Sequence, residues 1–205
     1  YLTLDKTMQN FLEDAMTNVE QEYNPDSMVA IVADAKTGEI LAMSQRPTFD
    51  PETRIGLENN WLNYVTQEVI EPGSTMKVFT LAAAIETGNW HPNATFKSGA
   101  YTLLDRTIRD HNKYGWGEIT YLEGFQRSSN TAMAYLLSLM GNDTFVNYLE
   151  KFGFGQKTGI DLPGEVTGTI LTRYPIEYVT TSYGQGSTVT PIQLIQAMTA
   201  ITNDG

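Results

Sequence analysis

The sequence predicts an α+β fold in which helices pack on a small antiparallel sheet. Apolar residues recur at helical spacing along residues 5–21, and the same spacing returns in several later segments. Two short apolar runs, MVAIVAD at 28–34 and ILAMS from residue 40, flank a glycine-containing turn, which predicts a β-hairpin. A lone hairpin is a marginal sheet, and both ends of the chain look cut, so we expect strands outside this chain to complete it.

The other elements are predicted from helix start and stop signals. Helices are expected at 74–87 with Gly88 as the C-cap, from near Thr120 into QRSSN, at 131–140 up to Gly141, at 144–152, and from Pro191 onward. Residues 47–70 are expected to be mostly loop with a short helix in WLNYV, and residues 89–117 to be loops with short strands. The Gly- and Pro-punctuated segment 153–186 is expected to be loop.

Composition limits the classes of function. With 205 residues the chain is one domain or a large part of one. A net charge of -11 argues against binding nucleic acid or anionic membrane surfaces. The absence of cysteine excludes disulfides, thiol catalysis and Cys-type zinc sites. The apolar runs are too short for a membrane span and no signal peptide opens the chain, so we expect any membrane anchor to lie outside this sequence.

The stretch EPGSTMKVFTLAAAIETG (71–88) places Ser74 and Lys77 on the first turn of an apolar helix. Residues three apart share a helix face, so a lysine that burial keeps neutral could take the proton of the serine hydroxyl. The N–H groups of that turn could stabilise an oxyanion. The alternative is structural, with Ser74 as the N-cap and Lys77 solvated. Ser and Lys are common enough for an S-x-x-K to occur by chance roughly once in such a chain.

A second polar cluster, Ser128-Ser129-Asn130, lies where one predicted helix ends and the next begins. These residues could simply cap helices, because Ser and Asn are favoured there. They could also form S-x-N, in which Ser128 relays a proton and Asn130 donates a hydrogen bond to a bound substrate. Two such motifs, each at a helix terminus, are much rarer by chance than either alone. Trp116, within KYGWGE, could line the substrate cleft or serve packing.

The remaining polar residues give weaker signals. His91 and His111 are far apart and lack metal-ligand spacing, so no metal site is predicted. Two acidic pairs are expected to be solvated charges rather than the carboxylates of a glycosidase: Asp105/Asp110 and Glu20/Glu22.

Four segments, EPGSTMK, SSN, FGFGQKTGIDLPGE and SYGQGSTVTPIQL, occur in an order that resembles the transpeptidase domain of class B penicillin-binding proteins. These are the division-type enzymes, and the match has a Gram-positive character. The resemblance runs from the TGEILAM hairpin to the last residue. It implies the α+β penicillin-binding, serine β-lactamase-like transpeptidase fold, with the C-terminal strands missing from this chain.

The resemblance also implies a peptidoglycan D,D-transpeptidase. Ser74 would be the nucleophile on the D-Ala-D-Ala carbonyl of a stem peptide, Lys77 the general base, and Ser128 the relay that protonates the leaving D-Ala. Three residues would bind substrate: Asn130, Ser129 and Trp116. No metal or organic cofactor is implied.

The partners that the resemblance implies are stem peptides, β-lactams, the missing part of the same domain and cell-division proteins, but no nucleic acid. The implied location is extracytoplasmic, with a membrane anchor in a segment outside this chain.

The family has a third motif, K-[ST]-G followed by Ser or Thr on an inner strand, and the chain holds two K-T-G copies. The copy at 36–38 precedes S-x-x-K and falls in the predicted hairpin turn. The copy at 157–159 is followed by Ile160 and by Pro163-Gly164, which argues against a central strand. We interpret neither as the third motif. Residues 1–205 are then the N-terminal and central part of a single transpeptidase domain, which alone is expected to be incomplete for catalysis.

Three alternatives share parts of this pattern: a serine β-lactamase, a β-lactam sensor, and a non-catalytic interaction module. A class A β-lactamase adds a glutamate that activates water for deacylation, usually within E-x-x-L-N. No such segment occurs in this sequence. A sensor would be acylated without turning over peptide, and a module would not be acylated.

Overall fold

A computed structural model describes residues 2–58 and 60–203 of the chain. The described residues form two compact units. The first unit contains residues up to Ile70 together with 157–167 and 190–203, and the second contains residues 71–156 and 168–189. Each unit is therefore built from segments that are distant in the sequence.

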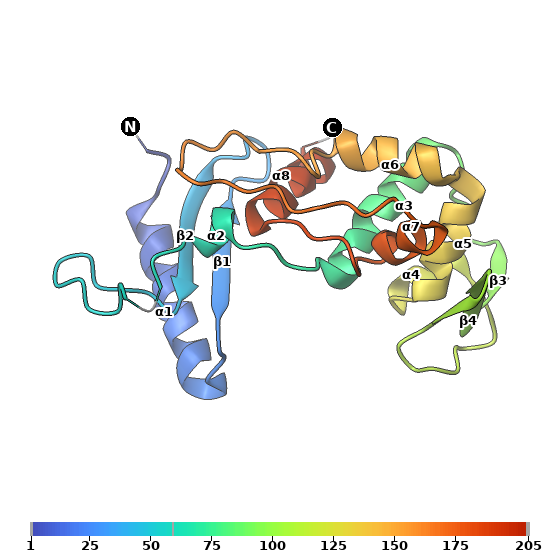
Figure 1. The fold of residues 1–205 in the computed structure, drawn as a ribbon, viewed down its shortest axis with the longest axis horizontal. Helices are drawn as coiled ribbons and strands as arrows, with labels where there is room; N and C mark the ends of the chain where they lie inside the picture. The colour runs from blue at the N-terminus through green and yellow to red at the C-terminus, as the bar shows by residue number, and fades with distance from the viewer. Residues whose placement is uncertain (1, 59, 204–205) are drawn as a thin grey trace. The chain divides into compact units, whose positions relative to one another are not determined.

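The first unit is a β-hairpin covered by helices (Figure 1). Its strands run antiparallel, with Met28 opposite Arg46 and Ile31 opposite Met43. The predicted first helix and the predicted hairpin are confirmed. The elements are α1 (Lys6–Tyr23), β1 (Met28–Ala33), β2 (Ile40–Arg46), α2 (Tyr64–Gln67) and α8 (Pro191–Thr202).

A buried arginine ties α1 to β2. The Arg46 guanidinium donates to Glu13 at 2.9 Å and to Glu20 at 3.2 Å, and it also reaches Thr17 of α1. Glu20 is therefore an ion-pair partner of a buried arginine rather than a freely solvated charge, and that expectation is corrected. Glu22 is exposed, as predicted.

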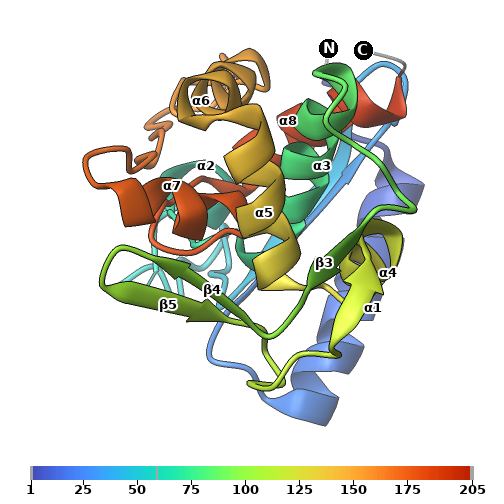
Figure 2. The same cartoon turned by 90° about the vertical axis from the view of Figure 1, so that its right-hand side faces the viewer.

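The second unit packs α3 and α5 together, with the strands beside α5 (Figure 2). The α3–α5 core contains fully buried Met76, Phe79, Met133 and Leu136. Strand β3 pairs with β6, and β4 pairs with β5, both antiparallel. The elements are η1 (Gly73–Thr75), α3 (Met76–Glu86), β3 (Thr95–Lys97), β4 (Ala100–Leu103), β5 (Arg106–Arg109), β6 (Glu118–Thr120), α4 (Tyr121–Gln126), α5 (Asn130–Met140), α6 (Asn142–Lys151) and α7 (Pro175–Ser182).

One helix was not expected, and three predicted helices begin at other residues: α2 at Tyr64, α3 at Met76 and α6 at Asn142. The segment 153–186, expected to be loop, contains α7. Pro175 is compatible with this helix because it occupies the first helical position, where a backbone N–H would have no partner within the helix. The Glu177 carboxylate accepts the N–H groups of Arg173 and Tyr174 there. The short helix expected in WLNYV starts at Tyr64, where Asn63 caps it. In the described residues, none of the helices has the length and hydrophobicity needed to cross a bilayer.

Neither K-T-G copy lies in a strand. The copy at 36–38 forms the turn between β1 and β2, where Asp34 Oδ1 accepts the N–H groups of Lys36 and Thr37. The copy at 157–159 lies in a loop, where the Glu165 carboxylate accepts from the N–H and hydroxyl of Thr158 at 2.7 and 2.6 Å. The structure confirms that both copies lack the strand context of the family's third motif.

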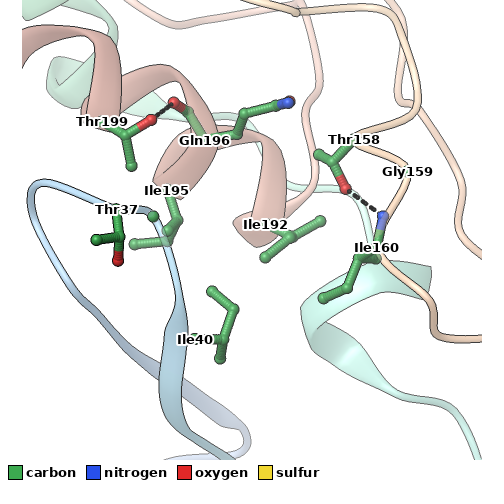
Figure 3. Close-up of a pocket in the computed structure, with 10 residues that line it drawn as sticks. Thr37, Ile40, Thr158, Gly159, Ile160, Ile192, Ile195, Gln196 and Thr199 are labelled. Atoms are coloured by element: carbon green, nitrogen blue, oxygen red, sulfur yellow. Dashed lines mark hydrogen bonds between the residues drawn. The ribbon is translucent and has the colours of Figure 1, made fainter. Parts of the chain in front are cut away.

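A cavity of about 360 Å³ in the first unit is lined by both K-T-G turns and by α8 (Figure 3). Ile40, Ile192 and Ile195 give it apolar walls, while Thr37 and Thr158 add a hydroxyl from each K-T-G copy. None of the predicted catalytic residues lines it. The candidate active site lies instead within the second unit.

Candidate active site

Ser74 lies in the 3-10 turn η1 that leads into α3, and it is exposed. Gly73 has a φ of +56°, a conformation that glycine adopts without strain. The Thr75 hydroxyl donates to the Pro72 carbonyl and closes the turn. No side chain caps either η1 or α3, so the structural alternative, in which Ser74 is the N-cap, is wrong. The turn presents the Ser74 hydroxyl to solvent at the start of a buried helix.

Lys77 lies one turn into the same segment and is only 2 % exposed. Its Nζ donates to the Ser128 carbonyl at 2.5 Å and to Ser128 Oγ at 3.0 Å. Burial lowers the pKa of Lys77 from 10.5 to about 8, and the negative charge of Asp110 opposes part of that shift. The alternative of a solvated lysine is therefore wrong, and the expected burial is confirmed.

Ser128 connects the two residues. Its Oγ lies 3.0 Å from Lys77 Nζ and 3.0 Å from Ser74 Oγ. A continuous path of hydrogen bonds thus joins the exposed serine to the buried amine. Ser128 also has a φ of +54°, which a non-glycine residue keeps only when its surroundings enforce it. Both its carbonyl and its hydroxyl contact the lysine in that conformation.

The capping role in the S-x-N segment belongs to Ser129 rather than to Ser128 or Asn130. Ser129 Oγ accepts the Ala132 N–H at 3.0 Å, and the residue is fully buried. The expectation that Ser129 contacts substrate does not fit this position, because a substrate does not reach a buried cap. Asn130 begins α5 and is half-buried, and its Nδ2 donates to the Arg109 carbonyl at 3.1 Å.

Trp116 is half-exposed and packs in a small aromatic cluster. Its ring centroid lies 5.4 Å from that of His111, and the Arg127 guanidinium lies 5.4 Å above the ring. These contacts support a packing role, and contact with substrate stays a prediction. Across the part of the chain that the structure describes, no group of three or more His, Asp or Glu side chains could hold a metal ion.

Asp110 is buried, with only 2 % of its surface exposed. Its carboxylate accepts hydrogen bonds from Gly99, Ser129 and Thr131. Burial raises the pKa of Asp110, but these bonds outweigh burial and hold that pKa below its ordinary value. The expectation of a solvated charge is wrong for Asp110 and right for Asp105, whose side chain is 84% exposed.

The loop after α7 holds the Ser74 turn by backbone contact. The Gly73 N–H donates to the Gly184 carbonyl at 2.9 Å, and the Gly186 N–H donates to Glu71 at 2.9 Å. A Cβ on Gly184 would collide with the Gly73 backbone. Gly184 of the GQG segment therefore permits the close backbone approach to the nucleophile's turn, and Gly186 contributes its N–H to the Glu71 carboxylate.

Residues 28–205 match the family described as penicillin binding protein transpeptidase domain. Stage V sporulation protein D of Bacillus subtilis is 40% identical over 211 residues, which cover 100% of this chain and 33% of that protein. The probable peptidoglycan D,D-transpeptidase FtsI of Caulobacter vibrioides is 31% identical over 207 residues, covering 100% of this chain and 35% of that protein.

A solved structure is similar over the same extent. The crystal structure of penicillin binding protein 2X from Streptococcus thermophilus matches with a TM-score of 0.93 and 37% sequence identity, covering 100% of this chain and 31% of that chain. The chain therefore spans about a third of the length of each of these relatives.

Gly184→Ala should destabilise the protein by about 3 kcal/mol, since an added Cβ meets the Gly73 backbone and φ is +88°. Gly88→Ala is the matched control. Its φ is +71° and nothing lies within 4 Å of an added Cβ, so we expect the backbone strain alone to cost about 1 kcal/mol. Urea unfolding measures both losses. Equal losses would mean that the approach of Gly184 to Gly73 does not constrain the turn.

Lys77→Met should raise the melting temperature by a few degrees at slightly acidic pH. A lysine pKa lowered from 10.5 to about 8 corresponds to about 3 kcal/mol of destabilisation, which the bonds to Ser128 offset in part.

The effect has a defined pH dependence. Between pH 8 and 10.5 the folded chain releases the Lys77 proton while the unfolded chain keeps it. The free energy of unfolding of the wild type therefore rises across this range, and its difference from that of the methionine variant becomes smaller. Thermal unfolding on both sides of that window measures this. A methionine variant that is less stable throughout would contradict the assignment.

Proposed function

This chain belongs to the penicillin-binding protein transpeptidase family, and from that premise we propose that it performs the acylation chemistry of a peptidoglycan D,D-transpeptidase. Its fold is the α+β fold of the penicillin-binding transpeptidases. The observation that carries the proposal is the path of hydrogen bonds from Ser74 through Ser128 to Lys77. The relative named as a probable peptidoglycan D,D-transpeptidase supports the substrate class.

In the proposed reaction, Ser74 Oγ attacks the carbonyl of the penultimate D-Ala of a stem peptide. The Ser74 proton goes to the neutral amine of Lys77, directly or through the Ser128 hydroxyl that touches both groups. A lysine pKa of about 8 leaves roughly a tenth of the molecules with a neutral amine at pH 7. The N–H of Ser74, in the first turn of η1, is positioned as an oxyanion donor.

Collapse of the tetrahedral intermediate breaks the peptide bond, and Ser128 delivers the proton from Lys77 to the leaving D-Ala nitrogen. The amine of a neighbouring stem peptide then attacks the acyl carbon, the bond to Ser74 Oγ breaks, and the proton lost by the amine returns through Lys77 and Ser128 to Ser74 Oγ, which leaves the cross-linking amide. Asn130 is the residue that we propose orients the substrate amide, because its own side chain is held in place by the Arg109 carbonyl. We also propose that Trp116 lines the substrate site, which is supported only by the half exposure of its side chain.

We also propose that neither K-T-G copy supplies the family's third motif. The loop position of both copies, and the engagement of Thr158 by Glu165, support this. Residues 1–205 then form part of a single transpeptidase domain. Because peptidoglycan lies outside the cytoplasm, we propose an extracytoplasmic site of action, with β-lactams as inhibitors. A membrane anchor and cell-division partners follow from the class B resemblance only.

Fluorescent penicillin should label the wild-type protein covalently, at its full natural length, and should not label Ser74→Ala. Ser138→Ala, which changes an exposed serine of α5, is the control and should be labelled normally. A label that persists, together with release of D-Ala from a stem peptide in the presence of an acceptor amine, is the expected result.

Other outcomes would identify the alternatives. Rapid loss of the label would indicate a β-lactamase, and a lasting label without peptide turnover would indicate a sensor. An unlabelled wild-type protein would contradict the proposed chemistry and favour an interaction module.

The acylation rate should rise with pH along a limb centred near pH 8, since neutral Lys77 is the proton acceptor and its pKa is about 8. Lys77→Arg should slow acylation by about 1000-fold or more, because arginine stays protonated. Lys97→Arg, on an exposed residue of β3, is the control. Labelling rates from pH 6 to 10 provide the measurement. An arginine variant with substantial activity would remove Lys77 from the role of base.

A further inference from the structure

We propose that Asp110 is a positioning residue for acylation, which holds the Ser128–Asn130 segment in place and sets the electrostatic environment of the Lys77 amine. This inference rests on the proposed function and adds to it a residue that touches neither the substrate nor Ser74. It is carried by the hydrogen bonds that converge on one buried carboxylate.

The Asp110 carboxylate accepts four hydrogen bonds. Oδ1 accepts from Ser129 Oγ at 2.8 Å and from the Thr131 N–H at 3.0 Å. Oδ2 accepts from the Gly99 N–H at 2.8 Å and from Thr131 Oγ1 at 2.9 Å. A buried carboxylate with this number of donors is fixed in place and stays ionised.

These bonds hold three consecutive residues of the S-x-N region against the end of β5. Ser129 and Thr131 bind Asp110 itself, and Asn130 between them binds the carbonyl of Arg109. Ser128, at a φ of +54°, directly precedes this anchored segment. The anchoring explains how a non-glycine residue keeps a conformation that brings its carbonyl and hydroxyl to the Lys77 amine.

Asp110 also acts on Lys77 through its charge. Among the described residues no lysine or arginine forms an ion pair with Asp110, and the Lys77 amine is a cation on which its negative charge acts. That charge favours the protonated amine and keeps the pKa of Lys77 from falling further than burial alone would take it. Both effects arise from a single carboxylate, and different substitutions separate them.

The other elements packed against α3 contribute little charge close to Lys77. Helix α5 contributes one titratable side chain, the phenol of Tyr135, and the turn η1 contributes none. Helix α7 contributes Tyr178 and Glu177, and Glu177 is bound to the N–H groups at its own N-terminus. The ionised side chains of α6 are exposed: Asp143, Glu150 and Lys151.

The test compares Asp110→Asn, Asp110→Glu and the control Asp105→Asn in the protein at its full natural length. Asp105 belongs to the same β4–β5 hairpin and is exposed, so its substitution should change nothing. Asp110→Asn removes the charge and one acceptor. It should slow acylation by fluorescent penicillin by about 10- to 100-fold at high pH and move the ascending limb to lower pH by about half a unit or more.

Asp110→Glu keeps the charge but displaces the carboxylate, so it should lower the plateau rate while the limb stays near that of the wild type. Wild-type rates and an unmoved limb in Asp110→Asn would overturn the proposal. A slower rate with an unmoved limb and a lowered melting temperature would also overturn it, because a merely structural residue would give that result.

If Asp110→Asn does not fold, Thr131→Val removes one donor to the carboxylate and keeps the charge. It should slow acylation by about 10-fold, and a full rate would overturn the proposal. If the wild-type protein itself is not labelled, the proposed function fails rather than this inference. NMR titration of the isotope-labelled Lys77 side chain then tests whether the Asp110 charge acts on the amine. We expect a lower titration midpoint in Asp110→Asn than in the wild type, and an unchanged midpoint would overturn the proposal.

Discussion

Removing the Lys77 amine from water is unfavourable, and the geometry of the site depends on how the surrounding groups accommodate it. The amine donates hydrogen bonds to two oxygens of a single residue, the carbonyl and the hydroxyl of Ser128. Because no carboxylate pairs with it directly among the described residues, the amine loses much of its affinity for the proton. A direct ion pair would have favoured the protonated amine, which cannot accept a proton from Ser74. The site therefore keeps an amine that can accept a proton near neutral pH, at a cost in the stability of the fold.

The same constraint explains the strained backbone at Ser128 and the close glycine contacts at the Ser74 turn. Ser128 keeps a left-handed conformation to present both oxygens, and Gly73 keeps another so that the chain can turn sharply before Ser74. Gly184 packs its backbone against Gly73, which leaves no space for a side chain. Rigid backbone contacts hold a reacting hydroxyl more precisely than flexible side chains do.

The residues of the candidate site differ strongly in how far they are exposed to solvent. Ser74 is exposed, Ser128 and Asn130 are half-buried, and Lys77, Ser129 and Asp110 are buried. The groups that we propose meet substrate are thus backed by a layer of groups that do not, and that layer supplies the cap of α5 and the anchored carboxylate. A substrate carbonyl would meet a preorganised surface at Ser74, which is the condition for electrostatic catalysis.

The sequence by itself determined much of the secondary structure and the identity of the two motifs. Helical spacing, the hairpin signal and the capping residues act over a few residues, so α1, the β1–β2 hairpin, α5 and α8 could be predicted from local rules. The residue types of Ser74, Lys77, Ser128 and Asn130 likewise indicated the chemistry before any geometry was known. Helix α7 escaped prediction because Gly and Pro around it are loop signals as often as helix signals.

Only the tertiary structure decided what those residues touch. The contact between Ser74 and Ser128 joins positions 54 residues apart, and no local rule brings them together. Tertiary packing also separated the roles within one tripeptide, making Ser129 the buried cap and leaving Ser128 to contact the lysine. Asp110 resembles Asp105 in sequence, yet one is buried under four hydrogen bonds and the other is exposed. Burial depends on the whole chain, and so do the pKa of a lysine and the anchoring of a carboxylate, because desolvation and hydrogen-bond geometry arise only when distant segments pack together.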